Sequence, residues 1–185
     1  MQVEVTYRCR LQCPLCMRET DEGKSLIKQY RDMPLEDFKK ILEFSNSIQL
    51  CGNVSDPIYH PKFLDILDMF YKRDRGRMIV STNGSGKRLE WWKEAFSKSK
   101  RIAWIFGLDG TTQESANKYR VNTDFDSVFN AMILGREMGV WICWQMIKFP
   151  YNEKEIEQYK ELCATYGIET YTKDSRMPNE AKKLK

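Results

Sequence analysis

The sequence lacks any apolar run that approaches the roughly 18 residues needed to span a bilayer. Residues 1–7 show no basic start followed by an apolar segment, so no secretion signal is expected. Low-complexity segments and sequence repeats are also absent. These absences favour a cytoplasmic protein that does not engage a membrane.

Histidine is almost missing as well, since His60 is the only one. The chain has six cysteines, and without an export signal they indicate reduced thiols and metal binding rather than disulfides. Cys51, Cys143 and Cys163 stand at no metal-ligand spacing, and we expect them to be small buried side chains. No cysteine follows Cys163, so the last part of the chain offers no thiols for an additional cluster.

Charge is moderate in amount and uneven in position. The 30% of charged side chains and the length of 185 residues indicate one globular domain. The net charge of +4 is small for a nucleic-acid-binding domain. Residues 72–101 nevertheless carry ten Lys and Arg against three acidic residues, which keeps nucleotide or RNA binding as an alternative. We favour solvated outer helix faces for these charges, so a nucleic-acid partner is not expected.

Hydrophobic periodicity predicts strands that alternate with helices. The predicted strands cover residues 3–7, 48–51, 78–81, 102–108, 140–147 and 168–171. The predicted helices cover residues 35–45, 61–70, 89–96, 125–133 and 156–166, whereas residues 17–33 are predicted to form a loop. This order indicates an α/β fold with a parallel sheet that curls into an open, partial (β/α)6 barrel. We expect a single domain over residues 1–173 and a polar C-terminal tail over residues 174–185.

Polar segments follow five of the predicted strands at the points where the strands end. They are residues 9–16, 52–57, 81–84 and 109–110, together with Gln145. Ligands of parallel β/α folds bind beyond the carboxyl ends of the strands. We therefore expect these segments to share one rim of the barrel.

The most specific motif is the C-x3-C-x2-C run of Cys9, Cys13 and Cys16. Thiolates suit zinc or iron–sulfur clusters. Structural zinc sites and simple electron-transfer cubanes use four protein ligands, and no fourth ligand occurs at a matching spacing. Three thiolates therefore favour a cluster with one iron open for a substrate or cofactor. A zinc site completed by His60 or a distant cysteine, in a non-catalytic binding module, stays open as an alternative.

This motif resembles the signature of the radical S-adenosylmethionine (SAM) superfamily. The resemblance implies a [4Fe–4S] cluster on Cys9, Cys13 and Cys16, with SAM on the fourth iron through its amino and carboxylate groups. It also implies an enzyme that cleaves SAM reductively to a 5′-deoxyadenosyl radical, which then abstracts hydrogen from a substrate. Cluster potentials extend to the low values that this cleavage requires. An electron donor of the flavodoxin or ferredoxin type is implied as a partner.

The resemblance further implies SAM contacts in the loops after the second and third strands. Gly52, Asn53 and Asp56 resemble a loop that binds the SAM amino group, although Gly-Asn-Val-Ser-Asp-Pro replaces the commoner Gly-Gly-Glu-Pro pattern. Ser81 and Asn83 resemble a ribose-binding segment. Taken alone, both segments are also ordinary turn sequences.

Four more residues complete the implied cofactor site. Asp109 is expected to point into the barrel cavity, and Arg120 resembles an arginine that pairs with the SAM carboxylate. Gln145 resembles a polar residue near the adenine or ribose, and Leu15 stands where an aromatic residue usually packs near the adenine. Without the resemblance, Asp109 is a strand cap, Arg120 a surface arginine and Gln145 part of the barrel wall. No residue that acts on the substrate is indicated.

The Phe-Gly-Leu-Asp-Gly strand ending, the Tyr119-Arg120 pair and Asn53 look most like the core barrel of radical SAM enzymes with a C-terminal SPASM domain. Those members often modify peptides or proteins, so a peptide or protein substrate is expected. A SPASM domain needs further cysteines and is lacking here, so the chain is either a minimal enzyme or the barrel part of a longer one. A radical SAM enzyme acting on a nucleotide or RNA is the alternative.

Overall fold

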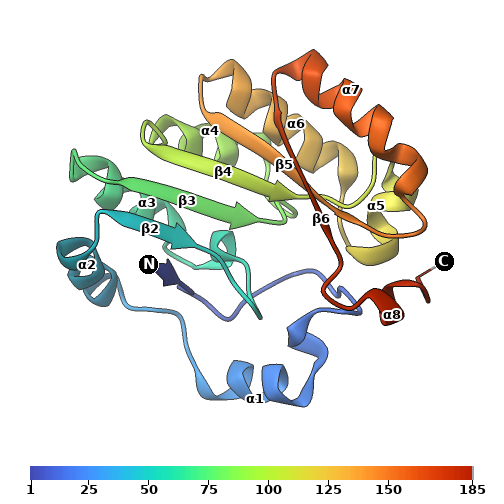
Figure 1. Cartoon of the computed structure of the whole chain (residues 1–185). Coiled ribbons are helices and arrows are strands. Elements are labelled where there is room, and N and C mark those ends of the chain that lie inside the picture. Colours follow the sequence, from blue (N-terminus) through green and yellow to red (C-terminus); the bar gives the residue numbers. More distant parts are fainter. Residues whose placement is uncertain (185) are drawn as a thin grey trace.

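A six-stranded parallel sheet forms the centre of the computed structural model, which describes residues 1–184 (Figure 1). Each strand pairs with the next one along the sequence. The strands are β1 (Gln2–Val3), β2 (Ser47–Leu50), β3 (Arg77–Thr82), β4 (Ile102–Gly107), β5 (Trp141–Lys148) and β6 (Glu169–Asp174). Because β1 and β6 stand at opposite edges of the sheet, the barrel is open. This confirms the predicted partial (β/α)6 barrel.

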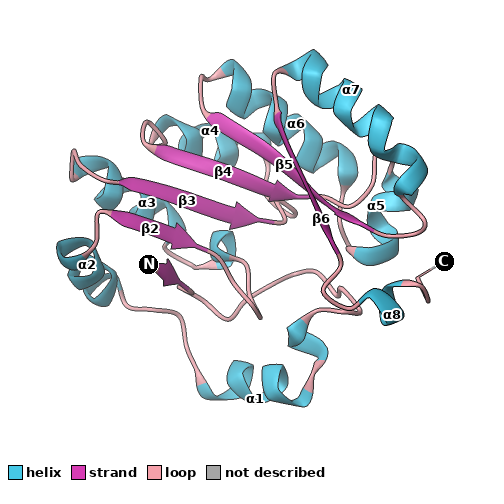
Figure 2. Ribbon diagram, in the orientation of Figure 1, coloured by secondary structure: helices cyan, strands magenta, loops and turns pink. Residues whose placement is uncertain are grey.

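Helices cover one face of the sheet, as Figure 2 shows for α3, α4, α6 and α7. The α-helices are α1 (Asp21–Gln29), α2 (Leu35–Phe44), α3 (Phe63–Lys72), α4 (Leu89–Ser97), α5 (Gln113–Tyr119), α6 (Phe125–Glu137), α7 (Ile156–Tyr166) and α8 (Pro178–Ala181). Short 3-10 turns occur at Met17–Glu19, Pro57–Tyr59 and Glu153–Glu155. Among the helices of residues 1–184, none is both long and apolar enough to cross a membrane.

Aromatic side chains fill the space between β4 and the helix layer. The Trp92 ring of α4 packs against Trp104 and Phe106 of β4, with ring centroids 5.5 and 5.1 Å apart. All three side chains are fully buried. Successive strand residues point to opposite faces, so Ile105 and Gly107 face the other side of the sheet. That side is the interior of the barrel.

Three α-helices occur where the sequence predicted none: α8 in the predicted C-terminal tail, and α1 and α5 between predicted elements. The predicted loop over residues 17–33 is wrong at α1, which begins after Thr20, and the Thr20 side chain accepts a hydrogen bond from Gly23 N at 3.1 Å. α5 begins with a capping box formed by Thr112 and Ser115. α1 and α5 are short and mostly polar, so apolar periodicity does not reveal them. Their capping residues were the available signal.

β1 is shorter than the strand predicted over residues 3–7, because only Gln2–Val3 pair with β2. At Val5 the chain changes partner, and the Val5 carbonyl accepts a hydrogen bond from Met33 N at 2.9 Å. Met33 lies in the segment that follows α1. The sheet therefore ends early at this edge, and the next residues lead directly into the cysteine loop.

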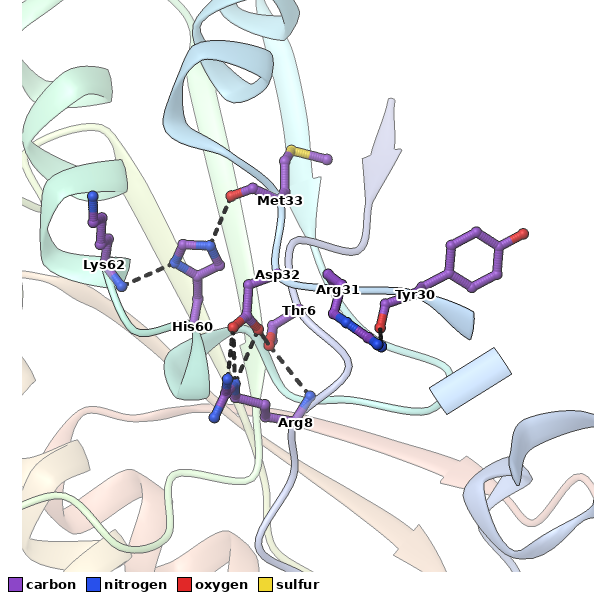
Figure 3. Close-up of polar contacts among 8 residues, drawn as sticks. All are labelled: Thr6, Arg8, Tyr30, Arg31, Asp32, Met33, His60 and Lys62. Carbon is purple, nitrogen blue, oxygen red and sulfur yellow. Dashed lines mark hydrogen bonds and ion pairs between the residues drawn. The ribbon is translucent and has the colours of Figure 1, made fainter. Parts of the chain in front are cut away.

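An anchor formed by Thr6, Arg8 and Asp32 holds the chain just ahead of the cysteine loop (Figure 3). Thr6 Oγ1 donates a hydrogen bond to Asp32 Oδ1 at 2.5 Å, and Arg8 Nη2 lies 2.9 Å from Asp32 Oδ2. The segment after α1 is thus fastened to the residues that precede Cys9. This fixes where the cysteine loop starts.

The His60→Ala variant is expected to lower the free energy of unfolding by about 2 kcal/mol, because a buried side chain with two hydrogen bonds is lost. His60 Nε2 lies 2.9 Å from Met33 O, and Nδ1 accepts from Lys62 N at 3.0 Å (Figure 3). Urea denaturation measures the loss. Lys62→Ala is the matched control, because Lys62 uses only its backbone N–H here. An equal loss in both variants would contradict this role for His60.

Arginines of the basic stretch over residues 72–101 donate hydrogen bonds to backbone carbonyl groups at the ends of helices. Arg101 Nη2 donates to the carbonyls of Phe70 and Tyr71 in α3 at 3.1 and 3.2 Å. Arg73 Nη1 donates to Ser45 O, just after α2, at 2.6 Å. Basic side chains commonly satisfy the last carbonyls of helices in this way. Part of the local positive charge is therefore explained without a nucleic-acid partner.

Candidate functional site

A cavity of about 140 Å³ lies at the carboxyl ends of β2, β3, β4 and β5. Six residues predicted to bind SAM line it, namely Gly52, Asp56, Ser81, Asn83, Arg120 and Gln145. Leu15, Asn53 and Asp109 are not among its lining residues. The cavity brings together residues that lie almost 100 positions apart in the sequence, from 52 to 145. The rule that ligands bind at strand ends predicts this gathering.

Five lining residues were not predicted to bind SAM: Cys51, Ser55, Thr82, Ile105 and Gly107. The strand register explains two of them. Ser81 pairs with Ile105, and Gly107 pairs with Gln145, so these residues lie side by side on adjacent strands. Ile105 and Gly107 are two positions apart in β4 and so share a face. This alternation along β4 was the sequence signal that could have found them.

Asp56 joins the loop after β2 to the end of β3. Its carboxylate accepts hydrogen bonds from Thr82 Oγ1 at 2.8 Å, Asn83 N at 2.5 Å and Ile58 N at 3.2 Å. Only 3% of the residue is exposed, and this burial raises the pKa of the Asp56 carboxyl to about 6 in spite of the hydrogen bonds. The Asp56 oxygens are therefore already engaged by the protein.

This pKa predicts a pH dependence of stability. The folded protein binds the Asp56 proton more tightly than the unfolded chain, so stability from this group is present below about pH 4 and lost as the pH rises through about 6. Between pH 4 and 7 the metal-free protein should lose about 2 kcal/mol of unfolding free energy through Asp56. Urea denaturation of the wild type and of Asp56→Asn at four pH values isolates this effect. Parallel pH profiles for the two proteins would contradict it.

Asp109 and Arg120 form a buried ion pair. Arg120 Nε lies 2.7 Å from Asp109 Oδ2, and Asp109 Oδ1 accepts a hydrogen bond from Ile147 N at 2.6 Å. Burial raises the pKa of the Asp109 carboxyl, and the Arg120 guanidinium limits that rise. Against the effect of burial, the Asp109 carboxylate raises the pKa of Arg120. Asp109 thus acts on the cavity through Arg120, which lines it.

Gly107 leaves the space that the Arg120 guanidinium occupies. A Cβ atom on Gly107 would lie only 2.6 Å from Arg120 Nη2 and 3.2 Å from Nη1. The guanidinium therefore lies against bare backbone at the cavity wall. A planar guanidinium with its two Nη groups is well suited to bind a carboxylate.

The cysteine loop is held on two sides. Gln12 N donates to Val121 O at 3.1 Å, which joins the loop to the connection between α5 and α6. Arg18 Nη1 donates to Tyr7 O at 2.8 Å and also to Val54 O, in the loop after β2. The loop after β2 and the connection between α5 and α6 thereby both hold the cysteine loop.

The thiols of this loop fit an iron–sulfur cluster in their chemistry and surroundings. Burial raises the pKa of Cys9 to about 11 and that of Cys13 to about 12, and Arg120 partly opposes the rise at Cys13. Deprotonated thiols at such sites need bound metal as compensation. Within residues 1–184, no three His, Cys, Asp or Glu side chains take positions for a single metal ion. Cluster thiolates bind separate iron atoms, so this finding does not argue against an iron–sulfur cluster. It gives no support to a zinc site with a single metal ion.

Two polar groups contact the cysteine sulfur atoms. Asn83 Nδ2 lies 3.6 Å from Cys9 Sγ, and Asn53 O lies 3.8 Å from Cys16 Sγ. Asn83 is buried, whereas Asn53 is exposed. Because Asn83 also lines the cavity, the cavity and the cysteine loop are adjacent.

Comparison with protein families matches residues 3–163 to the radical SAM superfamily. A curated relative from Pyrococcus furiosus is described as a tungsten-containing aldehyde ferredoxin oxidoreductase cofactor-modifying protein. It is 30% identical over 102 residues, which cover 51% of this chain and 26% of the relative.

Two solved structures are similar in fold. Streptococcus suis SuiB bound to its precursor peptide SuiA has a TM-score of 0.77 at 14% identity, over 100% of this chain and 41% of that one. Native anSMEcpe with bound AdoMet has a TM-score of 0.67 at 17% identity, over 94% of this chain and 50% of that one. The chain therefore spans half or less of the length of these relatives.

Proposed function

The chain belongs to the radical SAM superfamily, and we propose that Cys9, Cys13 and Cys16 bind a [4Fe–4S] cluster while the adjacent cavity binds SAM. The family uses these two cofactors, and the chain is a radical SAM enzyme. The observation that carries the proposal is the cavity, because the ends of several strands meet there beside the cysteine loop. The whole reaction and its substrate are part of the proposal.

The cavity walls offer groups suited to the charged end of SAM. The Arg120 guanidinium, held by Asp109, is proposed to pair with the carboxylate. Gly52 and Asn53 belong to the loop proposed to receive the amino group, and Asp56 keeps that loop joined to β3. In this arrangement Asp109 acts through Arg120, whereas Asp56 both orients the loop and lines the cavity.

The remaining walls suit the nucleoside part of SAM. Ser81 and Asn83 offer a hydroxyl and a carboxamide, which can both donate to and accept from a ribose diol. Gln145 supplies another carboxamide, and Leu15 in the cysteine loop is proposed to pack near the adenine.

When bound, the cluster and SAM supply the reductive cleavage that yields methionine and a 5′-deoxyadenosyl radical, which takes hydrogen from the substrate. The protein orients the cofactors and excludes water from the cavity. An electron donor of the flavodoxin or ferredoxin type is proposed as a partner. All six cysteines are free thiols in the structure, which supports a reducing compartment such as the cytoplasm.

Anaerobic reconstitution tests the proposal. The protein is loaded with iron and sulfide, then given dithionite and SAM. About four iron atoms per chain and 5′-deoxyadenosine detected by mass spectrometry are expected. Colourless, zinc-loaded protein that forms no 5′-deoxyadenosine would overturn it.

A peptide or protein is the proposed substrate. The strand ending at residues 106–110 and the Tyr119-Arg120 pair resemble peptide-modifying members of the family. SuiB, which is similar in fold, has been solved with its precursor peptide. The open barrel adds support, because no strand pairs β6 to β1 within residues 1–184, and an open side suits a large substrate.

Deuterium transfer distinguishes this substrate class from RNA. The reconstituted enzyme is incubated with dithionite, SAM and either a digest of fully deuterated cell protein or fully deuterated RNA. Deuterium in 5′-deoxyadenosine is expected with the peptides. Deuterium transfer from the RNA alone would favour the nucleic-acid alternative.

A further inference from the structure

The Asn83 side chain lies between β3 and the cysteine loop in a single defined orientation. Asn83 Oδ1 accepts a hydrogen bond from Ser85 N at 2.9 Å, so the Nδ2 group must be the end that faces Cys9 Sγ at 3.6 Å. Only 6% of Asn83 is exposed. The Asn83 carboxamide is thus a buried N–H donor aimed at a cysteine sulfur.

The backbone around Asn83 is held equally firmly. Asn83 N donates to Asp56 Oδ2 at 2.5 Å, and Gly84 N donates to Thr82 Oγ1 at 2.9 Å. Gly84 has a positive φ of 73°, and a Cβ there would come within 2.8 Å of the Phe106 ring. The loop therefore has little freedom to turn the carboxamide away from the cysteine loop.

The two sulfur contacts differ in what deprotonation does to them. At Cys16 the thiol is the donor to the Asn53 carbonyl, so this hydrogen bond disappears once the thiol becomes a thiolate. At Cys9 the amide is the donor, so the contact persists and strengthens with a negatively charged sulfur. Only the Asn83 contact can therefore act on a metal-bound thiolate.

We propose that Asn83 donates an N–H···S hydrogen bond to the Cys9 thiolate and thereby raises the reduction potential of the cluster. This inference rests on the proposed cluster at Cys9, Cys13 and Cys16. Hydrogen bonds to the sulfurs are among the factors that set cluster potentials. The donor favours the reduced form because that form carries one more negative charge, and burial strengthens the effect. Asn83 is thus a positioning residue that makes reduction by an electron donor easier.

This role is compatible with a ribose contact. A carboxamide has two N–H donors and two acceptor lone pairs. One donor faces Cys9 and one lone pair faces Ser85 N. The second donor and the second lone pair stay available to a ligand in the cavity.

Redox titration followed by electron paramagnetic resonance tests the proposal on the reconstituted chain. Asn83→Leu removes the donor without adding charge, and Asn83→Asp keeps the acceptor for Ser85 N but removes the donor. Both variants are expected to have a more negative midpoint potential than the wild type, and the aspartate the more negative of the two. Asn130→Leu, on the exposed side of α6, is the matched control and should keep the wild-type potential.

A second measurement needs no variant and so remains decisive if the variants assemble no cluster. Protein labelled with ¹⁵N in its asparagine side chains is reconstituted and reduced, and pulsed paramagnetic resonance then records coupling between nitrogen and the cluster. Coupling to a side-chain nitrogen supports the hydrogen bond. Absence of coupling, or a wild-type potential in Asn83→Leu, overturns this inference while the cluster stands. Wild-type protein that assembles no cluster overturns the proposed function as well.

Discussion

Arg120→Met is expected to lower the free energy of unfolding of the metal-free protein by about 3–5 kcal/mol, because it leaves a buried carboxylate without its partner. The Asp109 side chain is fully buried and pairs with Arg120 at 2.7 Å. Methionine fills much of the same volume but supplies no charge. Urea denaturation at neutral pH measures the effect.

The pH dependence of that loss identifies its cause. Burial already raises the pKa of Asp109, and removing the Arg120 guanidinium raises it further. Protonation then relieves the unpaired charge, so the deficit of the variant should shrink as the pH falls. Asp109→Asn combined with Arg120→Met should recover much of the lost stability.

Lys40→Met is the control for this prediction. Lys40 pairs with Asp37 at 2.9 Å on the exposed surface of α2, so its replacement should leave the unfolding free energy nearly unchanged. An Arg120 variant as stable as this control, at every pH, would show that the buried pair contributes nothing.

Cys13→Ala is expected to reduce formation of 5′-deoxyadenosine by more than about 100-fold, because even the loss of an outer-shell partner costs metal sites 10–100-fold. Cys13 is the most buried of the three thiols in the loop. Bound iron should fall along with the product. Iron analysis and mass spectrometry after reconstitution measure both.

Cys163→Ala provides the matched cysteine control. Cys163 is fully buried in α7, within the hydrophobic core. Its replacement should keep the iron content and the product of the wild type. Equal iron in Cys13→Ala and Cys163→Ala would contradict the assignment of the cluster ligands.

The sequence was sufficient to predict the barrel and the cavity at the ends of its strands. The apolar residues that line each element have clear periods, as in β4, where Trp104 and Phe106 alternate with Ile105 and Gly107. The rule that ligands bind at strand ends then placed Gly52, Ser81 and Gln145 on one rim, as the structure does. α1 and α5 escaped prediction because their polar residues have no apolar stripe.

The pairing of side chains within the site could not be predicted. Asp109 was expected to face the cavity, whereas its oxygens meet Arg120 and Ile147 N. That pairing depends on α5, because Arg120 caps the C-terminal end of this helix, eleven positions after Asp109 in the sequence. The helix thereby returns Arg120 to the end of β4. Long-range contacts of this kind have no local sequence signal.

The cysteine loop is held in shape by residues that come much later in the sequence. Gln12 binds Val121, more than a hundred residues further on, and the anchor ahead of the loop needs Asp32. Contacts with such wide separation form only after the intervening chain has closed. A short synthetic peptide that contains Cys9, Cys13 and Cys16 would therefore lack the shape of the loop. During biosynthesis, iron loading should follow the emergence of α5 and α6 from the ribosome. It would then report that about the first three quarters of the chain have assembled.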